Sequence, residues 1–541
     1  MKNFFSLTKV LIKQTFRRGT NKKTSKGMIA LYIILGFLLL FAAASFVITA
    51  YMLGGAAKAQ ALEESTLSFL FTIVQLVVLF FGIPVILNTI YFSKDNEMLL
   101  AMPFKPAAVF TAKFVMVYFI EFLTTFVMMA TIIVPFAIAA NIGFSVGLVF
   151  AFILVPLLPL LLATLLAIPL MYLVSFFKNK GVFASIAYIL LFSIFFVVYF
   201  LFMVYMNSGA SGLFSSETEI NLTFTVGVSQ IMLPNKFLAI ACTSSFANGM
   251  LNFLYVVLIN LGLLGLAVVI SRFVYVRSIS RQLETPKMQN SKQKEFATRG
   301  VMKSLVQKDF NEIMRFPPLA FLCFSQIVMG LIFIMVALMP SLISNNPEVD
   351  MTAFIKPFLP VGLLAVNLIV FSSNYTAFTA ISRERDNFYL IKILPTRYED
   401  VLKSKVILGS IFNELIVIIS FIFGLALGAN ALEMLAVLIV ATLLGYAYCC
   451  LQVNLDLAEP KLKWDNPSKG LKNSKVSLIS IGIGVGIIII VIVAYILLLK
   501  LAAVGVIIFW IMLALFGLGL CFVMHKTLYN NAQEKFDKIE S

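Results

Sequence analysis

The sequence predicts an all-α integral membrane protein with about twelve transmembrane helices. They form two six-helix repeats of the same orientation, with both termini in the cytoplasm. Three observations lead to this prediction: the composition, a succession of long apolar runs, and the distribution of positive charge. Hydrophobic residues make up 61% of the 541-residue chain and charged residues only 12%. A soluble domain is about half apolar and a quarter charged, so this composition is typical of a bilayer protein.

Twelve apolar runs follow one another along the chain, and most are long enough to cross a bilayer, which takes roughly 20 helical residues. In the first half they span residues 28–53, 66–92, 114–140, 144–177, 182–206 and 250–273. In the second half they span residues 318–342, 354–381, 406–429, 431–455, 476–499 and 503–524. We expect helices because a helix satisfies each backbone amide within its own segment.

Basic residues separate cleanly between the two sides of this arrangement. With the N-terminus inside, the only lysines or arginines on the outer side, out of 41 in the chain, are Lys58, Lys236, Lys356 and Lys500. This is the charge bias of a multi-pass protein oriented by its cytoplasmic loops. The net charge of +16 therefore predicts contact with anionic membrane lipid, not with nucleic acid.

The two halves share a short pattern after their second apolar run. A constant offset of 292 residues aligns Pro103 with Pro395 and Lys113 with Lys405. An amphipathic stretch precedes each half and is expected to lie along the cytoplasmic interface. We therefore divide the chain into a first six-helix half (1–280), a cytoplasmic linker (281–303) and a second six-helix half (304–541). The repeat axis is expected along the membrane normal.

The segments that carry this pattern, 93–113 and 382–405, are the main candidate sites. Each begins with acidic residues, continues through bulky apolar residues and stops at a proline, which predicts a short cytoplasmic helix with an exposed apolar face. Such a face beside a membrane domain indicates a docking site. The alternative is a helix that lies on lipid headgroups. The candidate docking residues are Asp95, Glu97, Met98, Leu99, Pro103, Lys113, Arg383, Glu384, Phe388, Leu390, Pro395 and Lys405.

Two carboxylates fall at membrane depth, Glu121 and Glu414. Ionisable groups there are candidates for a translocation path. The alternative is a structural carboxylate that reaches or binds a basic residue at the interface. The five cysteines and the single histidine, His525, show no metal-ligand or catalytic spacing, so we predict neither a metal site nor catalytic residues.

At this point the residues resemble a known family. The run Ile381-Ser382-Arg383-Glu384, continuing to Phe388, Leu390, Pro395 and Lys405, resembles the loop after the second helix of type-2 ATP-binding-cassette (ABC) exporter permeases. The tract 459–464 is similar to one in their twelve-helix bacterial members. The first half departs from the pattern, because Phe92-Ser93-Lys94-Asp95 replaces its Ile-Ser-Arg-Glu opening.

The resemblance implies a permease subunit of an ATP-driven exporter in a bacterial cytoplasmic membrane, moving an amphipathic or hydrophobic substrate. It also implies that the two loops rest on two copies, or a related pair, of a cytosolic ABC ATPase. The chain has no Gly-x-x-x-x-Gly-Lys-[Ser/Thr] motif to cradle phosphates. We therefore expect a chain that is not itself an enzyme and holds no cofactor, with ATP-Mg bound by the partner subunits.

Two other functions remain as alternatives. An ion-coupled secondary transporter also has tandem six-helix halves, but residues 93–105 lack the Gly- and Arg-rich loop of the major facilitator class, and buried carboxylates are few. A regulatory membrane subunit could use the same architecture without transporting. A lipid-modifying enzyme would need clustered catalytic groups, which the sequence does not show.

Overall fold

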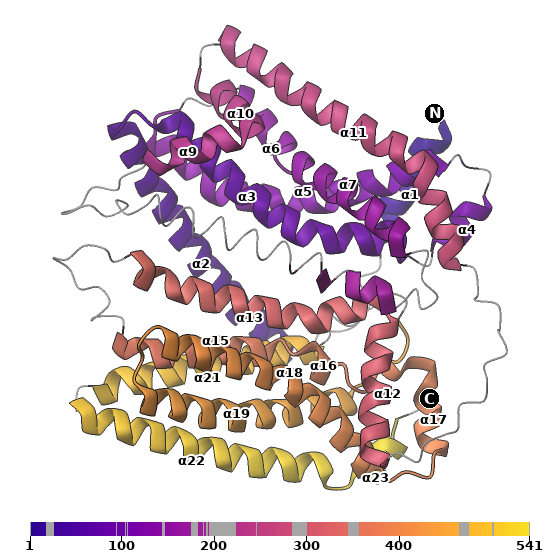
Figure 1. Cartoon of the computed structure of the whole chain (residues 1–541), viewed down its shortest axis with the longest axis vertical. Coiled ribbons are helices and arrows are strands. Elements are labelled where there is room, and N and C mark those ends of the chain that lie inside the picture. The colour runs from indigo at the N-terminus through magenta and orange to yellow at the C-terminus, as the bar shows by residue number, and fades with distance from the viewer. Residues whose placement is uncertain are drawn as a thin grey trace. The chain divides into compact units, whose positions relative to one another are not determined.

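The computed structural model (Figure 1) describes residues 2–17, 26–93, 95–102, 104, 106–142, 146–174, 182–187, 189–190, 193, 223–244, 246–283, 300–343, 356–464, 475–499 and 502–539. Throughout these ranges the regular elements are helices, and none is a strand. The all-α prediction is confirmed for this part of the chain. Contacts divide the chain into two compact units, Met1–Lys287 (unit 1) and Met288–Ser541 (unit 2).

Unit 1 is a set of helices of very different lengths. In chain order its described elements are α1 (Lys2–Arg17), α2 (Lys26–Ala59), α3 (Glu63–Ile86), the π-helix η1 (Leu87–Tyr91), α4 (Asp95–Ala101), α5 (Pro106–Ala139), α6 (Val146–Leu154), α7 (Leu157–Val174), α9 (Thr223–Ile231), α10 (Leu233–Thr243) and α11 (Phe246–Leu283).

Unit 2 begins with a charged helix and continues as a bundle of apolar ones. Its described elements are α12 (Val301–Arg315), α13 (Pro317–Ile343), η2 (Lys356–Phe358), α15 (Leu359–Ser372), α16 (Tyr375–Phe378), η3 (Ser382–Asn387), α17 (Phe388–Ile393), α18 (Tyr398–Ala426), α19 (Ala431–Ala458), α21 (Lys475–Leu499), α22 (Ala502–Tyr529) and α23 (Ala532–Asp537).

Among the described residues, nine helices are long and apolar enough to cross a membrane. Each overlaps one of the twelve predicted runs: Glu63–Tyr91, Pro106–Ala139, Gly147–Val174, Ala247–Phe273, Leu359–Arg385, Tyr398–Ala426, Ala431–Ala458, Lys475–Leu499 and Val504–Tyr529. A tenth is present if α12 and α13 are counted as one span, although they are bent by 106°. The structure is therefore compatible with a multi-pass membrane protein.

The remaining two predicted runs are only partly visible. Residues 28–53 lie within α2, of which Ala43–Ala59 counts as a shorter apolar helix. Residues 182–206 lie mostly outside the described residues.

The sharp bend between α12 and α13 has a local cause. Pro317 is the first residue of α13, a position where its missing N–H costs nothing and its fixed φ starts a helix. Helix α12 carries Lys303, Lys308, Glu312 and Arg315 in its 15 residues, whereas α13 has none of these residue types. We therefore place α12 outside the apolar spans. Figure 1 shows it crossing one end of the bundle of unit 2, where α17 and α23 also lie.

The core of unit 2 carries a polar seam where α16, α18 and α19 meet. Asn374 caps α16 by accepting the N–H of Ala377 at 3.2 Å. Its Nδ2 donates to the Gly409 carbonyl and to Oδ1 of Asn413, both at 2.9 Å. A Cβ at Gly409 would lie 3.1 Å from the Cβ of Ala377, so the glycine permits this close approach. The seam fixes the start of the segment that holds the candidate site, since buried amides must find partners.

In unit 1, α10 is tied to α3 in a similar way. Asn235 donates through Nδ2 to Thr72 Oγ1 and Gln75 Oε1, both at 2.9 Å. A Cβ on Gly147 would collide with the Ala241 carbonyl. The backbones of α6, which carries Gly147, and of α10 therefore approach closely, as small residues allow between membrane helices.

Candidate functional site

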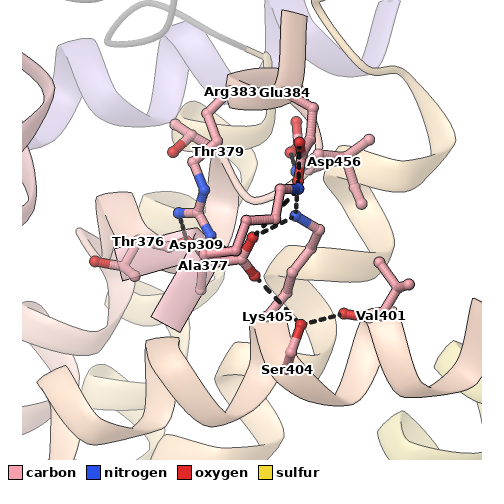
Figure 2. A network of polar contacts seen from close by, with 12 residues as sticks. Asp309, Thr376, Ala377, Thr379, Arg383, Glu384, Val401, Ser404, Lys405 and Asp456 are labelled. Atoms are coloured by element: carbon pink, nitrogen blue, oxygen red, sulfur yellow. Dashed lines mark hydrogen bonds and ion pairs between the residues drawn. The ribbon is translucent and has the colours of Figure 1, made fainter. Parts of the chain in front are cut away.

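Charged side chains from three elements of unit 2 meet where α12 packs against α18 (Figure 2). We call this group the ion cluster. It contains three cations and three carboxylates, namely Lys308, Asp309 and Glu312 from α12, Arg383 and Glu384 from η3, and Lys405 from α18. Its formal charges therefore balance.

The contacts within the ion cluster are short and mostly sheltered from water. Lys405 Nζ lies 2.6 Å from Glu384 Oε1 and 3.5 Å from Asp309 Oδ1. Lys308 Nζ lies 2.7 Å from the second Glu384 oxygen. The side chains of Lys405 and Glu384 are 0% and 1% exposed, so each charge depends on its partner for the stabilisation that water would otherwise give.

Arg383 extends the ion cluster toward α16. Its Nη1 donates to the Thr376 carbonyl at 2.9 Å, and its Nη2 lies 3.9 Å from Asp309 Oδ2. Figure 2 shows the guanidinium between Thr376 and Asp309. Arg383 therefore links the backbone of α16 to a carboxylate of α12.

The segment that follows α16 is held by a carboxylate of α19. Asp456 Oδ2 accepts the backbone N–H groups of Ile381 and Ser382 at 2.7 and 2.9 Å, and Oδ1 accepts the Ser382 hydroxyl. A carboxylate that accepts several donors in the interior is well satisfied. Asp456 therefore fixes the entry into η3.

A backbone break follows directly. Arg385 has φ 52° and ψ −131°, a conformation that costs a non-glycine residue about 1–3 kcal/mol and needs support from its surroundings. The Arg385 guanidinium lies over the Trp464 ring at 4.4 Å, and Trp464 Nε1 donates to the Ser382 carbonyl at 2.9 Å. The break redirects the chain into α17.

Helix α17 and the residues after it present an apolar surface. Phe388 and Ile391 point into the protein, with exposed fractions of 1% and 2%. The neighbouring side chains are exposed, at 43% to 72%, and we call them the tip surface: Tyr389, Leu390, Ile393 and Leu394. An apolar group of this kind left on a surface marks an interaction site.

Unit 1 contains a related but differently charged arrangement. Lys113 Nζ donates to the Thr89 carbonyl at 3.1 Å and to Asn96 Oδ1. Asn96 Nδ2 in turn donates to the Ile90 and Tyr91 carbonyls, both at 3.0 Å. Helix α1, which packs against α5, contains no acidic residue. A neutral amide thus stands where the equivalent lysine of unit 2 contacts a carboxylate.

The structure separates the predicted docking residues into interior and surface groups. It brings Arg383, Glu384 and Lys405 together in the ion cluster and buries three others in the interior: Leu99, Lys113 and Phe388. Met98, Leu390 and Pro395 are exposed, and Asp95 is half-buried. The side chain of Glu97 and the whole of Pro103 lie outside the described residues.

The two predicted path carboxylates are not equivalent. Glu121 is buried in α5 and accepts the Thr124 hydroxyl at 3.3 Å. Glu414 is half-buried in α18. The proposed role of either in a path stays a prediction.

Several site residues were missed from the sequence, above all Asp309 and Asp456. Asp309 precedes Ile313 by four residues, so both lie on one face of α12, and both are buried. An acidic residue on the buried face of an amphipathic helix indicates a buried ionic partner. That signal was present in the sequence. For Asp456 in α19, the sequence offered no comparable signal.

Three carboxylates of the ion cluster could also hold a metal ion. One oxygen each from Asp309, Glu312 and Glu384 lie within 4.8 Å of one another. Lys308 and Lys405, however, already contact two of these carboxylates, Glu384 and Asp309, with their own positive charge. The geometry is therefore that of a side-chain ion network.

Glu312 is a carboxylate of the ion cluster whose pKa is raised. Burial, and the nearby charge of Glu384, raise the pKa of Glu312 from 4.5 to about 6. Oε2 of Glu312 lacks a hydrogen-bond partner among the described residues. Glu312 therefore takes up a proton at a higher pH than an ordinary glutamate does.

The comparison with known families gives one match. The sequence model of a family described as "Putative ATP-binding cassette" matches residues 21–518, which is nearly the whole chain. Neither the curated proteins nor the solved structures include a match to this chain.

This match corrects four predictions made from the sequence. The resemblance to an exporter permease, the function of a permease subunit, the absence of enzyme activity and the binding of ATP-Mg by partner subunits alone all conflict with a family described as ATP-binding. The chain lacks one phosphate-binding motif, Gly-x-x-x-x-Gly-Lys-[Ser/Thr]. The family match covers residues 21–518. The absence of one motif excludes that motif only and does not exclude ATP binding.

The described part of the chain includes nine helices long and apolar enough to cross a membrane, and the chain matches an ATP-binding cassette family over most of its length. The chain belongs to this ATP-binding cassette family.

Proposed function

We propose that this chain is a multi-pass membrane component of an ABC transport system, with about twelve spans and both termini in the cytoplasm. Nine described helices of membrane length, the family match and the separation of basic residues support the proposal. In this arrangement the ion cluster and the tip surface lie on the cytoplasmic side, where ATP is available.

The tip surface is the proposed docking site for an ATP-hydrolysing cassette domain. The observation that carries this proposal is the contrast within one short helix: Phe388 and Ile391 are buried, while Leu390 and Ile393 are 43% and 72% exposed. Apolar anchors of this kind dominate the energy of interfaces.

The ion cluster connects the proposed docking site to the long helices of unit 2. It joins α12, η3 and α18, so a force on the tip surface reaches the long helix α18 through buried contacts, and Asn413 of α18 donates in turn to the Gly445 carbonyl of α19. Packed elements with charged contacts move as units because their interiors do not deform continuously. The counterpart in unit 1, with Met98 exposed on α4, is proposed as a second, less strongly anchored docking site.

The test uses the full chain purified in mild detergent from its native membrane, with ATP hydrolysis measured as phosphate release. The double variant Leu390→Asp, Ile393→Asp is expected to lower the hydrolysis that copurifies by at least about tenfold, because two charges replace apolar anchors. Val301→Asp, at another exposed apolar position of unit 2, is the matched control and should retain the activity.

Photolabelling with 8-azido-ATP adds an independent measurement. The family description implies that this chain itself becomes labelled. Full retention of hydrolysis by the double variant would contradict the docking proposal, whichever polypeptide carries the label.

A further inference from the structure

The end of the chain packs directly beneath the tip surface. After α22, the chain turns at Asn531, which has a left-handed φ of 54°, and forms the short helix α23. Phe536 of this helix is fully buried, and Ala532 and Ile539 are nearly so. We call residues 530–539 the C-terminal clasp.

Aromatic stacking connects the C-terminal clasp to both ends of the tip segment. The Phe536 ring stacks on Phe388 with centroids 5.9 Å apart and planes at 3°. It also stacks on Tyr398 at 4.7 Å and 10°. Phe388 begins α17 and Tyr398 begins α18, so one ring spans the whole segment that carries the tip surface. Such pairs add stabilisation beyond the burial of their area.

Polar contacts fix the clasp on both sides. Lys392 Nζ, from α17, donates to the Ile539 carbonyl at 2.7 Å. Lys535 Nζ donates to Asn454 Oδ1 at 3.1 Å and to the carbonyls of Thr527 and Leu528. The first contact holds the tip segment to the clasp. The others hold the clasp to α19 and to the end of α22.

The tip segment itself is short. Helix α17 has only six residues, and an isolated helix of that length is unstable in water. Its inner face, Phe388 and Ile391, belongs to the same apolar cluster as Leu528, Phe536 and Ile539. The shape of α17 therefore depends on the packing that the C-terminal clasp supplies.

We infer that the C-terminal clasp is a positioning element for the tip surface, with Phe536 as the residue that holds α17 in its docking conformation. In the absence of Phe536, the buried face of α17 loses its aromatic partner and the tip side chains lose their fixed arrangement. The inference rests on the proposed function only for the consequence that docking weakens.

Hydrogen exchange on the purified full chain tests the inference without any partner. In Phe536→Ala, the amides of residues 388–394 are expected to exchange at least about tenfold faster, because a large buried side chain has been removed from beneath them. Amides of α15 should keep their exchange rates. Lys538→Ala, at the exposed position that directly follows the same helix, is the matched control.

A second variant separates loss of contact from general misfolding. Phe536→Leu fills much of the space but cannot stack, so the exchange at 388–394 should lie between wild type and Phe536→Ala. Unchanged exchange at 388–394 in Phe536→Ala would overturn the inference, and so would an equal acceleration throughout unit 2. A failure of Leu390→Asp, Ile393→Asp to affect docking would instead count against the proposed function, while faster exchange in Phe536→Ala would still support the clasp.

Discussion

At the scale of single residues, Lys405 and Lys113 show how two equivalent lysines acquire different environments. Both are buried, at 0% and 2% exposed. Lys405 contacts two carboxylates, from Glu384 and Asp309, whereas Lys113 contacts an amide oxygen and a backbone carbonyl. The removal of each lysine therefore leaves a different kind of group unpaired.

Lys405→Met tests this difference. It leaves two buried carboxylates with too little positive charge, and a broken buried pair costs about 3–5 kcal/mol of unfolding free energy. The measurement is unfolding of the detergent-solubilised chain followed by circular dichroism or intrinsic fluorescence. Lys113→Met should cost less, because only neutral oxygens lose their donor.

The matched control is Lys403→Met, two residues away. Its side chain is 43% exposed and lies 3.9 Å from Asp400, so its loss should change stability by less than about 1 kcal/mol. A Lys405→Met variant as stable as Lys403→Met would show that the ion cluster does not hold unit 2 together.

At the scale of elements, the candidate site is an assembly of short pieces on long helices. Asp456 holds the entry into η3, Trp464 supports its break, the ion cluster joins it to α12, and Phe536 lies beneath α17. The elements η3 and α17 have six residues each, and a helix of that length is not stable alone. The arrangement therefore depends on buried side chains from neighbouring elements.

The link between α12 and η3 should depend on pH through Glu312. Since the folded pKa, about 6, lies above the ordinary 4.5, the folded chain holds a proton between these values that the unfolded chain has released. The unfolding free energy therefore falls as pH rises through this window, and the cost above it is about 2 kcal/mol.

Glu312→Gln removes that cost because glutamine does not ionise. The variant should be more stable than wild type at about pH 7.5, with the difference fading toward about pH 4.5. Thermal unfolding across this range measures it. Equal stability of variant and wild type at both ends would mean that the pKa of Glu312 is the same in the folded and the unfolded chain.

At the scale of the whole molecule, the two units have related loops that differ in charge. Unit 1 has Asn96 next to its lysine and an α1 without acidic residues, while unit 2 has Glu384 and an α12 that carries Asp309 and Glu312. The two proposed docking sites are therefore expected to be anchored unequally.

The proposed topology makes a direct prediction. A membrane-impermeant maleimide added to intact cells should label Lys58→Cys but neither Lys303→Cys nor Lys526→Cys, since the positive-inside arrangement places only Lys58 outside. All three lysines are exposed. The unmodified chain gives the background, because four of its five cysteines are buried. Labelling of Lys303→Cys from outside would overturn the topology.

The sequence by itself determined the helical class of the described residues and the positions of nine helices long and apolar enough to cross a membrane, because long apolar runs leave a helix as the way to satisfy the backbone in a bilayer. It also located both loops, through the repeated proline and lysine. It misjudged the relation to ATP, which the family match corrected.

Only the tertiary structure decided which loop residues face inward. Arg383, Glu384 and Lys405 look like surface charges in the sequence, yet Asp309 and Lys308 from 70 or more residues away make them an interior network. Phe536 is likewise unremarkable in a charged tail until it stacks on Phe388. The physical reason is that ionic and aromatic contacts depend on distances of a few ångströms between remote segments, and local periodicity carries no information about those distances.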